Sequence, residues 1–412
     1  MENERKLSSQ RVLTHLKEIA ALTSDEDGAQ RVAWTNTWAQ ARKWLTDKLD
    51  SYEIAYTIDS AGNLWAKVDG ESDEGIVVGS HLDSVPNGGW LDGVLGVTSA
   101  LEAIRHYKQQ DKKPAKTLYL IDWADEEGAR FGYSTFGSSA ASGTLDIEPL
   151  LGQKGIDGKV FEEALSEHGV DAKNVLNATD EMAEKNLTAY LEMHIEQGPV
   201  LEEAGQAVSA VNGIAGVKRN NLTFTGQAVH AGSFPTEMRQ DAFLAAAESA
   251  LGIRELALKY DAVSTVGKVA VEPGVVTIVP GKATISLDQR TTDAKALENL
   301  FHETKEVVQA AAEKHNVSVE WEEVMDKAPG VFDDELIELA KEAVEEETGT
   351  SYVMPSGPNH DAMEMSSLMP TVMLFVYSEK GISHAKEENT PDDKVEESVR
   401  AFLRLVDKII EK

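Results

Sequence analysis

Histidine and acidic side chains follow several strand-like segments of this chain, and their types are those of a metal site. The stretch HLDSVPNGGWLD places His81, Asp83 and Asp92 directly after the apolar run IVVGS. His194 ends a second apolar run, LTAYLEMH, and DWADEEG puts an acidic pair just beyond a third. A solvated turn accounts for Asp, Asn and Gly, but it does not require histidine. The pattern therefore indicates chemistry at these strand ends.

The acidic pair, Glu126 and Glu127, is costly in a cleft unless a cation or a shared proton compensates the repulsion. Because histidines end the neighbouring strands, a cation is the simpler explanation. Nitrogen and oxygen donors suit Zn²⁺, and also Mn²⁺, Co²⁺ or Ni²⁺. The candidate metal ligands are His81, Asp92, Glu127, His194 and His384. A carboxylate can bridge two ions about 3.5–4 Å apart, and Asp92 is the candidate for that bridge.

The HxD spacing also gives His81 a candidate partner of its own. Asp83 lies two residues further along and could hold the far ring nitrogen of His81. Such a contact fixes the tautomer of a metal-binding histidine. Taken alone, HxD is a weak signal for a metal. Together with the glutamate pair and two more strand-end histidines, it becomes a much stronger one.

The overall composition limits the partners of the protein. With 39 basic and 71 acidic residues, the formal charge of −32 disfavours binding to nucleic acid or to anionic membranes. No apolar run approaches the roughly 18 residues that span a bilayer, and MENERKLSSQ lacks the pattern of a secretory signal. We therefore expect a cytoplasmic protein. Cysteine is absent, which excludes disulfides, thiolate ligands and a cysteine nucleophile.

The elements that must position these residues form an α/β pattern. Strands are expected at residues 76–80, 117–122 and 187–194, and helices at residues 6–22, 34–49 and 93–106. Their alternation predicts a mostly parallel sheet with flanking helices. In such sheets, sites gather at the carboxyl ends of the strands.

The sequence pattern changes near Gly213, where closely spaced strands begin, with helices expected at residues 239–259 and 292–315. This predicts a smaller α+β domain at residues 213–326, inserted into a catalytic domain made of residues 1–212 and 327–412. Residues 144–186 look like an acidic, weakly patterned peripheral segment.

The order of motifs resembles a known family. The motifs are GSHLDSVPNGGWLDG, DEEGARFG, HIEQGPVLE, VHAGSFP, SGPNHDA and GISHAKEE. They resemble the M20-type metallo-amidohydrolases, specifically the hydantoinase/carbamoylase branch, which includes N-carbamoyl-L-amino acid hydrolases, allantoate amidohydrolases and β-ureidopropionases. The resemblance runs from the first helix to the last. It implies two divalent ions that share Asp92, and a homodimer in which the inserted domain acts as lid and dimerisation domain.

The resemblance also implies roles for individual residues. Glu126 matches the general base, and the chemistry agrees, since a carboxylate beside a ligand can take a proton from the attacking water. His230 in VHAG matches a residue that stabilises the developing oxyanion and contacts substrate. Gln197 and Gly357 match substrate contacts. His360 and Asp361 match residues near the site, with a structural role as open as a catalytic one.

Two further positions concern the substrate carboxylate. Arg290 in SLDQR is the candidate to capture it, because the planar guanidinium fits a carboxylate bidentately. An ordinary surface ion pair is the alternative for this arginine. Relatives with a carboxylate-binding asparagine would place it at Thr277, where this chain reads VVTIVPG. Threonine can donate a hydrogen bond but has a shorter reach, which bears on the identity of the substrate.

These observations predict an amidohydrolase that cleaves the carbamoyl C–N bond of an N-carbamoyl-L-amino acid, releasing the amino acid, CO₂ and ammonia. Allantoate or another ureido acid is the nearest alternative substrate, followed by a peptide. A serine hydrolase would need a G-x-S-x-G elbow, which FGSSAASG does not supply. GGWLDGVLG fails the G-x-G-x-x-G spacing of a nucleotide site. A non-enzymatic binding module would leave Glu126 without a purpose.

Overall fold

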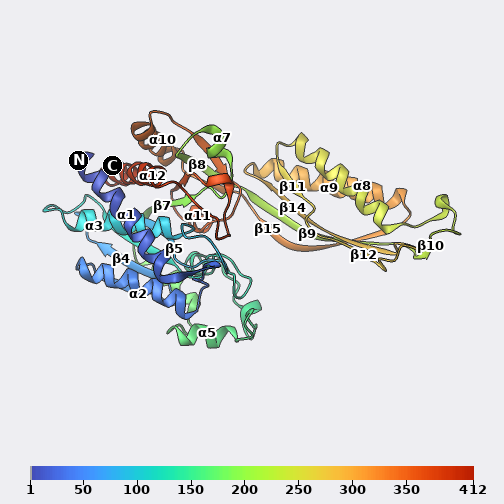
Figure 1. Ribbon diagram of the computed structural model, residues 1–412, viewed down its shortest axis with the longest axis horizontal. Coiled ribbons are helices and arrows are strands. Elements are labelled where there is room, and N and C mark those ends of the chain that lie inside the picture. Colours follow the sequence, from blue (N-terminus) through green and yellow to red (C-terminus); the bar gives the residue numbers. More distant parts are fainter. Residues whose placement is uncertain (1) are drawn as a thin grey trace. The chain divides into compact units, whose positions relative to one another are not determined.

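The computed structural model describes residues 2–412, with side chains from residue 5 onward. The chain divides into two compact units (Figure 1). Unit 1 comprises Met1–Asn212 and Val331–Lys412, and unit 2 comprises Gly213–Gly330. The second boundary predicted from the sequence, after Asp326, falls inside strand β15 (Ser318–Lys327). The strand continues past the acidic run at which the sequence pattern changes.

Unit 1 is built from a sheet and its covering helices. Its strands are β1 (Ser24–Asp25), β2 (Gly28–Ala29), β3 (Tyr56–Ile58), β4 (Leu64–Val68), β5 (Gly75–His81), β6 (Thr117–Trp123), β7 (Leu187–Ile195), β8 (Val208–Ile214), β16 (Gly330–Val331), β17 (Val353–Ser356) and β18 (Thr371–Val376). Its helices are α1 (Glu2–Thr23), α2 (Asn36–Ser51), α3 (Val94–Lys108), α4 (Phe136–Ser142), α5 (Phe161–Glu167), α6 (Ala178–Ala183), α7 (Val200–Ala204), α10 (Asp334–Thr348), α11 (Asp361–Ser366) and α12 (Asp392–Ile410). Strands β8 and β16 carry the chain across the boundaries of the unit.

The main sheet has nine strands in the order β16-β8-β18-β7-β5-β6-β4-β3, with β17 paired to β8. Its centre is parallel, because β18 pairs with β7, β7 with β5 and β5 with β6 in that sense. Toward the edges, β8, β4 and β3 pair in the antiparallel sense. The α/β class predicted from the sequence is confirmed, and the strands and helices predicted in unit 1 are present.

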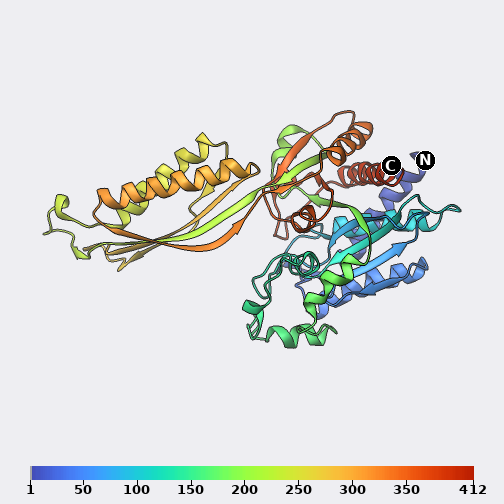
Figure 2. The ribbon, with the colours of Figure 1, turned by 180° about the vertical axis from the view of Figure 1, so that it is seen from behind.

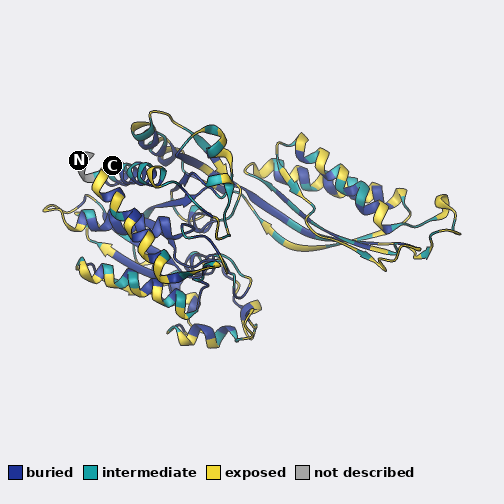
Figure 3. Ribbon diagram, in the orientation of Figure 1, coloured by how far each residue is buried: buried dark blue, intermediate teal, exposed yellow. Residues whose placement is uncertain are grey.

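The central strands are buried on both faces, which explains their nearly continuous apolar sequences. All seven residues of β5 and all six of β18 are buried, and these strands form part of the dark core of unit 1 in Figure 3. Helix α3 packs on β5, β6 and β7, while α10, α11 and α12 contact β18. The strand ends are therefore held rigidly, which is the condition for a precise site.

Residues 144–186 form more structure than their sequence pattern suggests. They contain α5 and α6 with short 3₁₀ turns, and they share a hydrophobic core with Trp34 and Phe136. The rings of Phe136 and Phe161 lie 5.7 Å apart in an edge-to-face arrangement. Helices of six or seven residues are too short to display a clear apolar period. The core is built with residues from elsewhere in the chain.

Unit 2 is a sheet with two long helices on one face. Its strands are β9 (Gly216–Thr225), β10 (Val229–His230), β11 (Val263–Thr265), β12 (Val269–Glu272), β13 (Ile278–Val279), β14 (Lys282–Thr291) and β15, and its helices are α8 (Ala242–Lys259) and α9 (Ala294–Lys314). The main path is β11-β14-β9-β15, all antiparallel. Alternate residues of β9 and β14 are buried, and the helices lie along the sheet in both views (Figures 1 and 2). Such alternation is typical of a sheet with one covered face.

Candidate metal centre

The parallel strands β5 and β7 lie side by side, so their carboxyl ends meet at one edge of the sheet. His81 is the last residue of β5, and His194 is next to last in β7. The chain leaves β5 through residues 82–92 and enters α3 directly after Asp92 and Gly93. Gly93 has φ +66°, and a Cβ there would lie 2.4 Å from Cε1 of His81. A glycine is required here so that Asp92 can approach the histidine.

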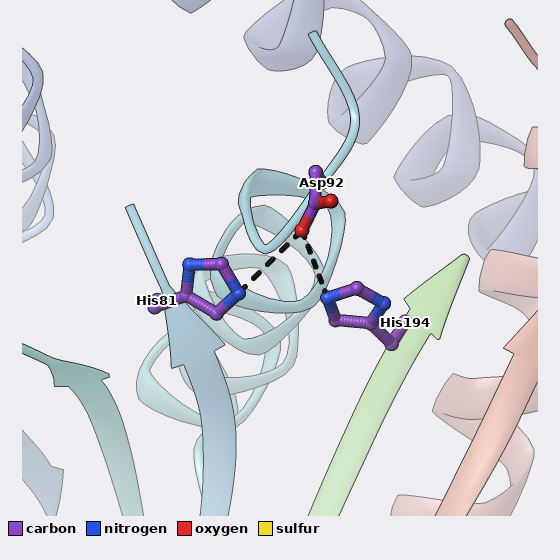
Figure 4. A group of neighbouring side chains, drawn as sticks. All are labelled: His81, Asp92 and His194. Carbon is purple, nitrogen blue, oxygen red and sulfur yellow. Dashed lines mark ion pairs between the residues drawn. The ribbon is translucent and has the colours of Figure 1, made fainter. Parts of the chain in front are cut away.

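The first group of candidate ligands consists of His81, Asp92 and His194 (Figure 4). The carboxylate of Asp92 lies between the two rings, with its Oδ1 3.6 Å from Nε2 of His81 and 3.1 Å from Nε2 of His194. The centroids of the two imidazole rings lie 5.7 Å apart, and the ring planes are inclined by 28°. All three side chains are buried. Two nitrogens and one oxygen thus converge on one small volume.

The second group consists of Asp92, Glu127 and His384. Nε2 of His384 lies 3.4 Å from Oδ2 of Asp92 and 3.5 Å from Oε2 of Glu127. His384 takes the left-handed conformation, with φ 54°, and its side chain is about half exposed. Each oxygen of Asp92 therefore faces a different group. This is the arrangement that a carboxylate bridging two ions requires.

The donor atoms fit divalent ions, as their surroundings show. Nδ1 of His81 hydrogen-bonds the Asp83 carbonyl at 3.1 Å, and Nδ1 of His194 hydrogen-bonds the Ile195 carbonyl at 2.9 Å. These contacts fix Nδ1 as the protonated nitrogen and leave the Nε2 lone pair for a metal. Nε2 of His81 and Oε1 of Glu127 are buried without a hydrogen-bond partner in the described residues. Unpartnered buried polar atoms are costly, and one divalent ion at each group would satisfy them.

Asp83 acts differently from the sequence prediction. Its carboxylate lies 3.7 Å from Nδ1 of His81, beyond hydrogen-bonding distance, because its own carbonyl occupies that nitrogen. The carboxylate instead accepts the backbone N–H groups of Glu126 and Glu127, at 3.2 and 3.0 Å. Asp83 therefore fixes His81 through its main chain and the glutamate pair through its side chain.

The electrostatics of the site favour a cation. Burial raises the pKa of Glu127 well above its ordinary value, and Asp92 raises it further. Burial likewise raises the pKa of Asp83, with Asp125 adding to the effect. Burial opposes ionisation of Asp92 as well, but His194, His384 and His81 together outweigh it and hold the pKa of Asp92 well below the usual range. Several buried carboxylates lie together with few positive charges nearby. Divalent ions would neutralise this excess of negative charge.

Glu126 lies beside the ligands without belonging to either group. Its Oε2 is 3.7 Å from Nε2 of His81, and its carboxylate is buried. Burial raises the pKa of Glu126 well above its ordinary value, and Asp361 and Glu127 raise it further. A carboxylate with a raised pKa, adjacent to the ligands, has the properties of a proton acceptor in hydrolysis.

His360 and Asp361 lie close to the same cluster. The ring of His360 is 4.3 Å from the ring of His194, and Oδ1 of Asp361 accepts a hydrogen bond from Ser138 at 2.5 Å. Gln197 donates from Nε2 to Oδ2 of Asp92 at 2.9 Å and takes a left-handed φ of 60°. Gly357 is exposed in the turn after β17. The structure thus brings Gln197 to the ligands themselves.

Sequence reasoning missed two buried glutamates of unit 1. Glu192 accepts hydrogen bonds from Ser80 at 2.8 Å and from the backbone N–H of Ala362 at 3.0 Å. Since alternate residues of a strand share a face, its position two residues before His194 was an available signal. Glu388 accepts the backbone N–H of Asp92 at 3.1 Å, and burial raises its pKa to about 7. Its signal was the motif GISHAKEE, four residues after His384.

The predicted residues of unit 2 do not all lie together. His230 and Thr277 are neighbours, because β10 pairs with β13 and the N–H of Ala231 donates to the Thr277 carbonyl at 2.8 Å. Both are exposed. Arg290 lies near the other end of β14, opposite Val217 of β9. Its Nε donates to Oδ1 of Asp288 at 2.7 Å.

An α/β unit whose strand ends gather histidine and carboxylate donors is typical of metal-dependent hydrolases. Residues 77–408 match the model of the peptidase family M20/M25/M40. The chain therefore belongs to this family, and the resemblance predicted from its motifs is confirmed.

Individual relatives are amidohydrolases. The chain is 31% identical to an N-carbamoyl-L-amino acid amidohydrolase of Geobacillus stearothermophilus, covering 94% of this chain and 95% of that one. It is 31% identical to an allantoate amidohydrolase of Escherichia coli, covering 92% of each. A solved amidase of the hydantoinase/carbamoylase family from Burkholderia multivorans superposes with a TM-score of 0.87 at 28% identity, covering 96% of each chain. The protein is thus a hydrolytic enzyme that acts on carbon–nitrogen bonds.

Proposed function

We propose that this enzyme removes the carbamoyl group of an N-carbamoyl-L-amino acid with the help of two divalent ions. The observation that carries the proposal is Asp92, whose two oxygens each face a separate set of nitrogen and oxygen donors. His81, Asp92 and His194 would hold one ion, and Asp92, Glu127 and His384 the other. We propose Zn²⁺ first, with Mn²⁺, Co²⁺ or Ni²⁺ as alternatives, since the donor types suit all four.

When bound, the ions would activate the attacking water and polarise the ureido carbonyl. Glu126 takes a proton from that water as its oxygen forms a bond to the ureido carbon. The bond from this carbon to the amino-acid nitrogen then breaks, and Glu126 returns the proton to the departing nitrogen. The carbamic acid left behind decomposes to CO₂ and ammonia. Asp83 keeps Glu126 in place by accepting its backbone N–H.

Arg290 is proposed to bind the substrate carboxylate. The Asp288 carboxylate accepts hydrogen bonds from Arg290 at 2.7 Å and from Nη2 of Arg219 at 2.7 Å. Two guanidinium groups therefore lie against one carboxylate. Guanidinium groups bind carboxylates well, so this end of β14 is where we propose that the substrate carboxylate binds. His230 would stabilise the oxyanion, and Thr277, Gln197 and Gly357 would contact substrate.

We propose that the enzyme is a homodimer whose copies share each site. Lys282 and Arg290 are eight residues apart along β14, which corresponds to roughly 26 Å at about 3.3 Å per residue. His230 lies beyond the Lys282 end, since β13 directly precedes β14. A single small substrate cannot contact His230 and Arg290 of the same chain. Both can act on it only if they come from two copies.

An exposed apolar stripe supports this assembly. Leu244, Leu251 and Leu258 are spaced seven residues apart on α8, so they lie on one face of the helix, and they are 46%, 69% and 64% exposed. Val263, on the edge strand β11, is 63% exposed. Surfaces of this kind commonly mark contacts between proteins. A second copy of unit 2 is the partner we propose.

We also propose a cytoplasmic location and small-molecule substrates that carry a carboxylate and a ureido or amide group. Nucleic acid and membranes are not expected partners, given the acidic composition. Within residues 2–412, no helix is long and apolar enough to cross a membrane.

Allantoate is the second candidate substrate, because relatives named for both activities are equally similar to this chain. The test is a parallel assay of N-carbamoyl-L-amino acids, allantoate and dipeptides with the metal-loaded enzyme, measuring amino-acid and ammonia release. Fastest turnover of an N-carbamoyl-L-amino acid is the expected result. Faster turnover of allantoate would transfer the proposal to that substrate, and hydrolysis of dipeptides alone would overturn both.

A further inference from the structure

Two loops that are distant in sequence carry two of the three ligands of the proposed second ion, Asp92 and His384, and one buried side chain connects them. We propose that Glu388 is a positioning residue that ties the Asp92 loop to the His384 loop and thereby holds ligands of the second ion in place. The inference rests on the proposed function, because it presupposes that Asp92 and His384 bind an ion. It concerns a residue outside both ligand groups.

The contacts of Glu388 reach both loops. Its Oε1 accepts the backbone N–H groups of Leu91 and Asp92, at 3.0 and 3.1 Å. Its Oε2 accepts the hydroxyl of Ser383 at 2.9 Å. Ser383 directly precedes His384, and Glu388 itself is 2% exposed. One carboxylate thus sets the position of the residues on either side of the second ion site.

The Asp92 loop is shaped to admit this carboxylate. A Cβ placed on Gly89 would lie 1.9 Å from the carboxylate carbon of Glu388. Gly89 does not adopt a positive φ, so its backbone conformation alone does not demand glycine. Space for Glu388 is therefore the reason that no larger residue fits.

The guanidinium group of Arg31 holds the same loop by donating hydrogen bonds to carbonyl groups of the loop. Arg31 is fully buried and donates from Nε to the Leu82 carbonyl at 2.9 Å and from Nη2 to the Gly89 carbonyl at 3.3 Å. Residues 82–92 lie between β5 and α3 outside any regular element, so these side chains supply much of their hydrogen bonding. Arg31 fixes the loop at Leu82 and Gly89, and Glu388 fixes the end that carries Asp92.

Ser383 adds a second way for Glu388 to act on Asp92. The Ser383 hydroxyl is 2.9 Å from Oε2 of Glu388 and 3.1 Å from Oδ2 of Asp92. It has one proton and can donate to only one carboxylate at a time. When the proton is directed to Glu388, Oδ2 of Asp92 keeps that lone pair for an ion. Without Glu388, the hydroxyl would compete with the ion for Asp92.

The experiment is a Zn²⁺ titration of metal-stripped, full-length protein by calorimetry. In Glu388→Ala we expect a 10- to 100-fold loss of affinity for one of the two ions, the range typical of residues that orient metal ligands. Glu388→Gln should lose less, because its amide oxygen can still accept the two backbone N–H groups. Glu387→Gln removes a neighbouring exposed charge and should bind both ions as the wild type does.

A double-mutant cycle identifies which ion is affected. His384→Ala removes a ligand of the second ion only, so adding Glu388→Ala to it should cause little further loss of Zn²⁺ affinity. Full additivity of the two changes would overturn the inference, as would wild-type affinity for both ions in Glu388→Ala. If Glu388→Ala fails to fold, Glu388→Asp, whose carboxylate is one methylene shorter, replaces it in the cycle, with the same expectation and the same contradiction. A wild type that binds no Zn²⁺ would instead refute the proposed function.

Discussion

The two units position their candidate functional residues in opposite ways. In unit 1, residues from four separate stretches meet within a few ångströms, because parallel strands end at one edge of the sheet. In unit 2, an antiparallel strand separates Arg290 from the His230 and Thr277 pair by most of its length. The difference indicates that unit 1 can assemble a metal centre alone, whereas the residues of unit 2 can share one substrate only across two copies.

The largest effect should come from Asp92→Ala. This change removes the carboxylate common to both ligand groups, so we expect loss of both ions and of all detectable hydrolysis.

His230→Ala should lower kcat by about 10²- to 10³-fold, as is typical for the loss of an oxyanion donor, while both ions stay bound. Metal analysis of the dialysed proteins checks both. Loss of metal from His230→Ala would break the separation of roles between the units.

Glu126→Gln should retain both ions and lose activity by about 10²- to 10⁴-fold, the usual contribution of a general base. The reason is that the amide cannot take the proton from water, although it preserves the size of the side chain. Steady-state kinetics and metal content, measured on the same sample, test this. Activity within a few-fold of the wild type would remove Glu126 from the mechanism.

Mixing two inactive variants tests the sharing of sites. Homodimers of His230→Ala and of Arg290→Ala should each be impaired, but a mixed dimer retains one site with both residues intact. Random re-association should then restore about a quarter of the wild-type activity, since half of the dimers are mixed and half of their sites are complete. Refolding the variants together and assaying the mixture measures this. No recovery would contradict the shared site, because it would mean that His230 and Arg290 of two copies do not act on one substrate.

A smaller effect concerns the stability of unit 1 in acid. Burial lowers the pKa of His15 to about 4, and Lys48 contributes in the same direction. The unfolded chain binds this proton near pH 6.5 and the folded chain only near pH 4, so stability is lost as the pH falls between these values. The full loss is roughly 3 kcal/mol, at about 1.4 kcal/mol per pKa unit. His15→Gln should unfold with a weaker acid dependence between pH 6.5 and 4, measured by denaturant titration.

Sequence reasoning succeeded where local pattern and global fold agree. The continuous apolar runs before His81 and His194 predict buried parallel strands, and parallel strands bring their ends together. The motif GISHAKEE marks Glu388 as a neighbour of His384, but its role could not be predicted, because its partners are backbone N–H groups that lie nearly three hundred residues away. Nor could sequence reasoning predict that the carbonyl of Asp83 contacts His81 while the carboxylate accepts the backbone N–H of Glu126. Which of the two groups faces His81 depends on the exact conformation of the turn.

In unit 2, the motifs identified the candidate residues, but the distance between these residues in the structure could not be predicted from the sequence. Motifs matched Arg290 and His230 individually, yet the pairing of β14 with β9 and β12 decides which end of the sheet each occupies. Antiparallel strands run in alternating directions. Knowing where a residue stands along its own strand therefore does not tell at which end of the sheet the residue lies. That information is absent from the local sequence.

The most direct test of the account is the number of divalent ions that each chain binds. Metal-stripped protein would be dialysed against buffered Zn²⁺ and analysed by mass spectrometry for zinc per chain, beside His384→Ala and Asp92→Ala. The account predicts about two ions for the wild type, about one for His384→Ala and none for Asp92→Ala. A wild type without bound zinc, and without bound Mn²⁺, Co²⁺ or Ni²⁺ in the same assay, would contradict it.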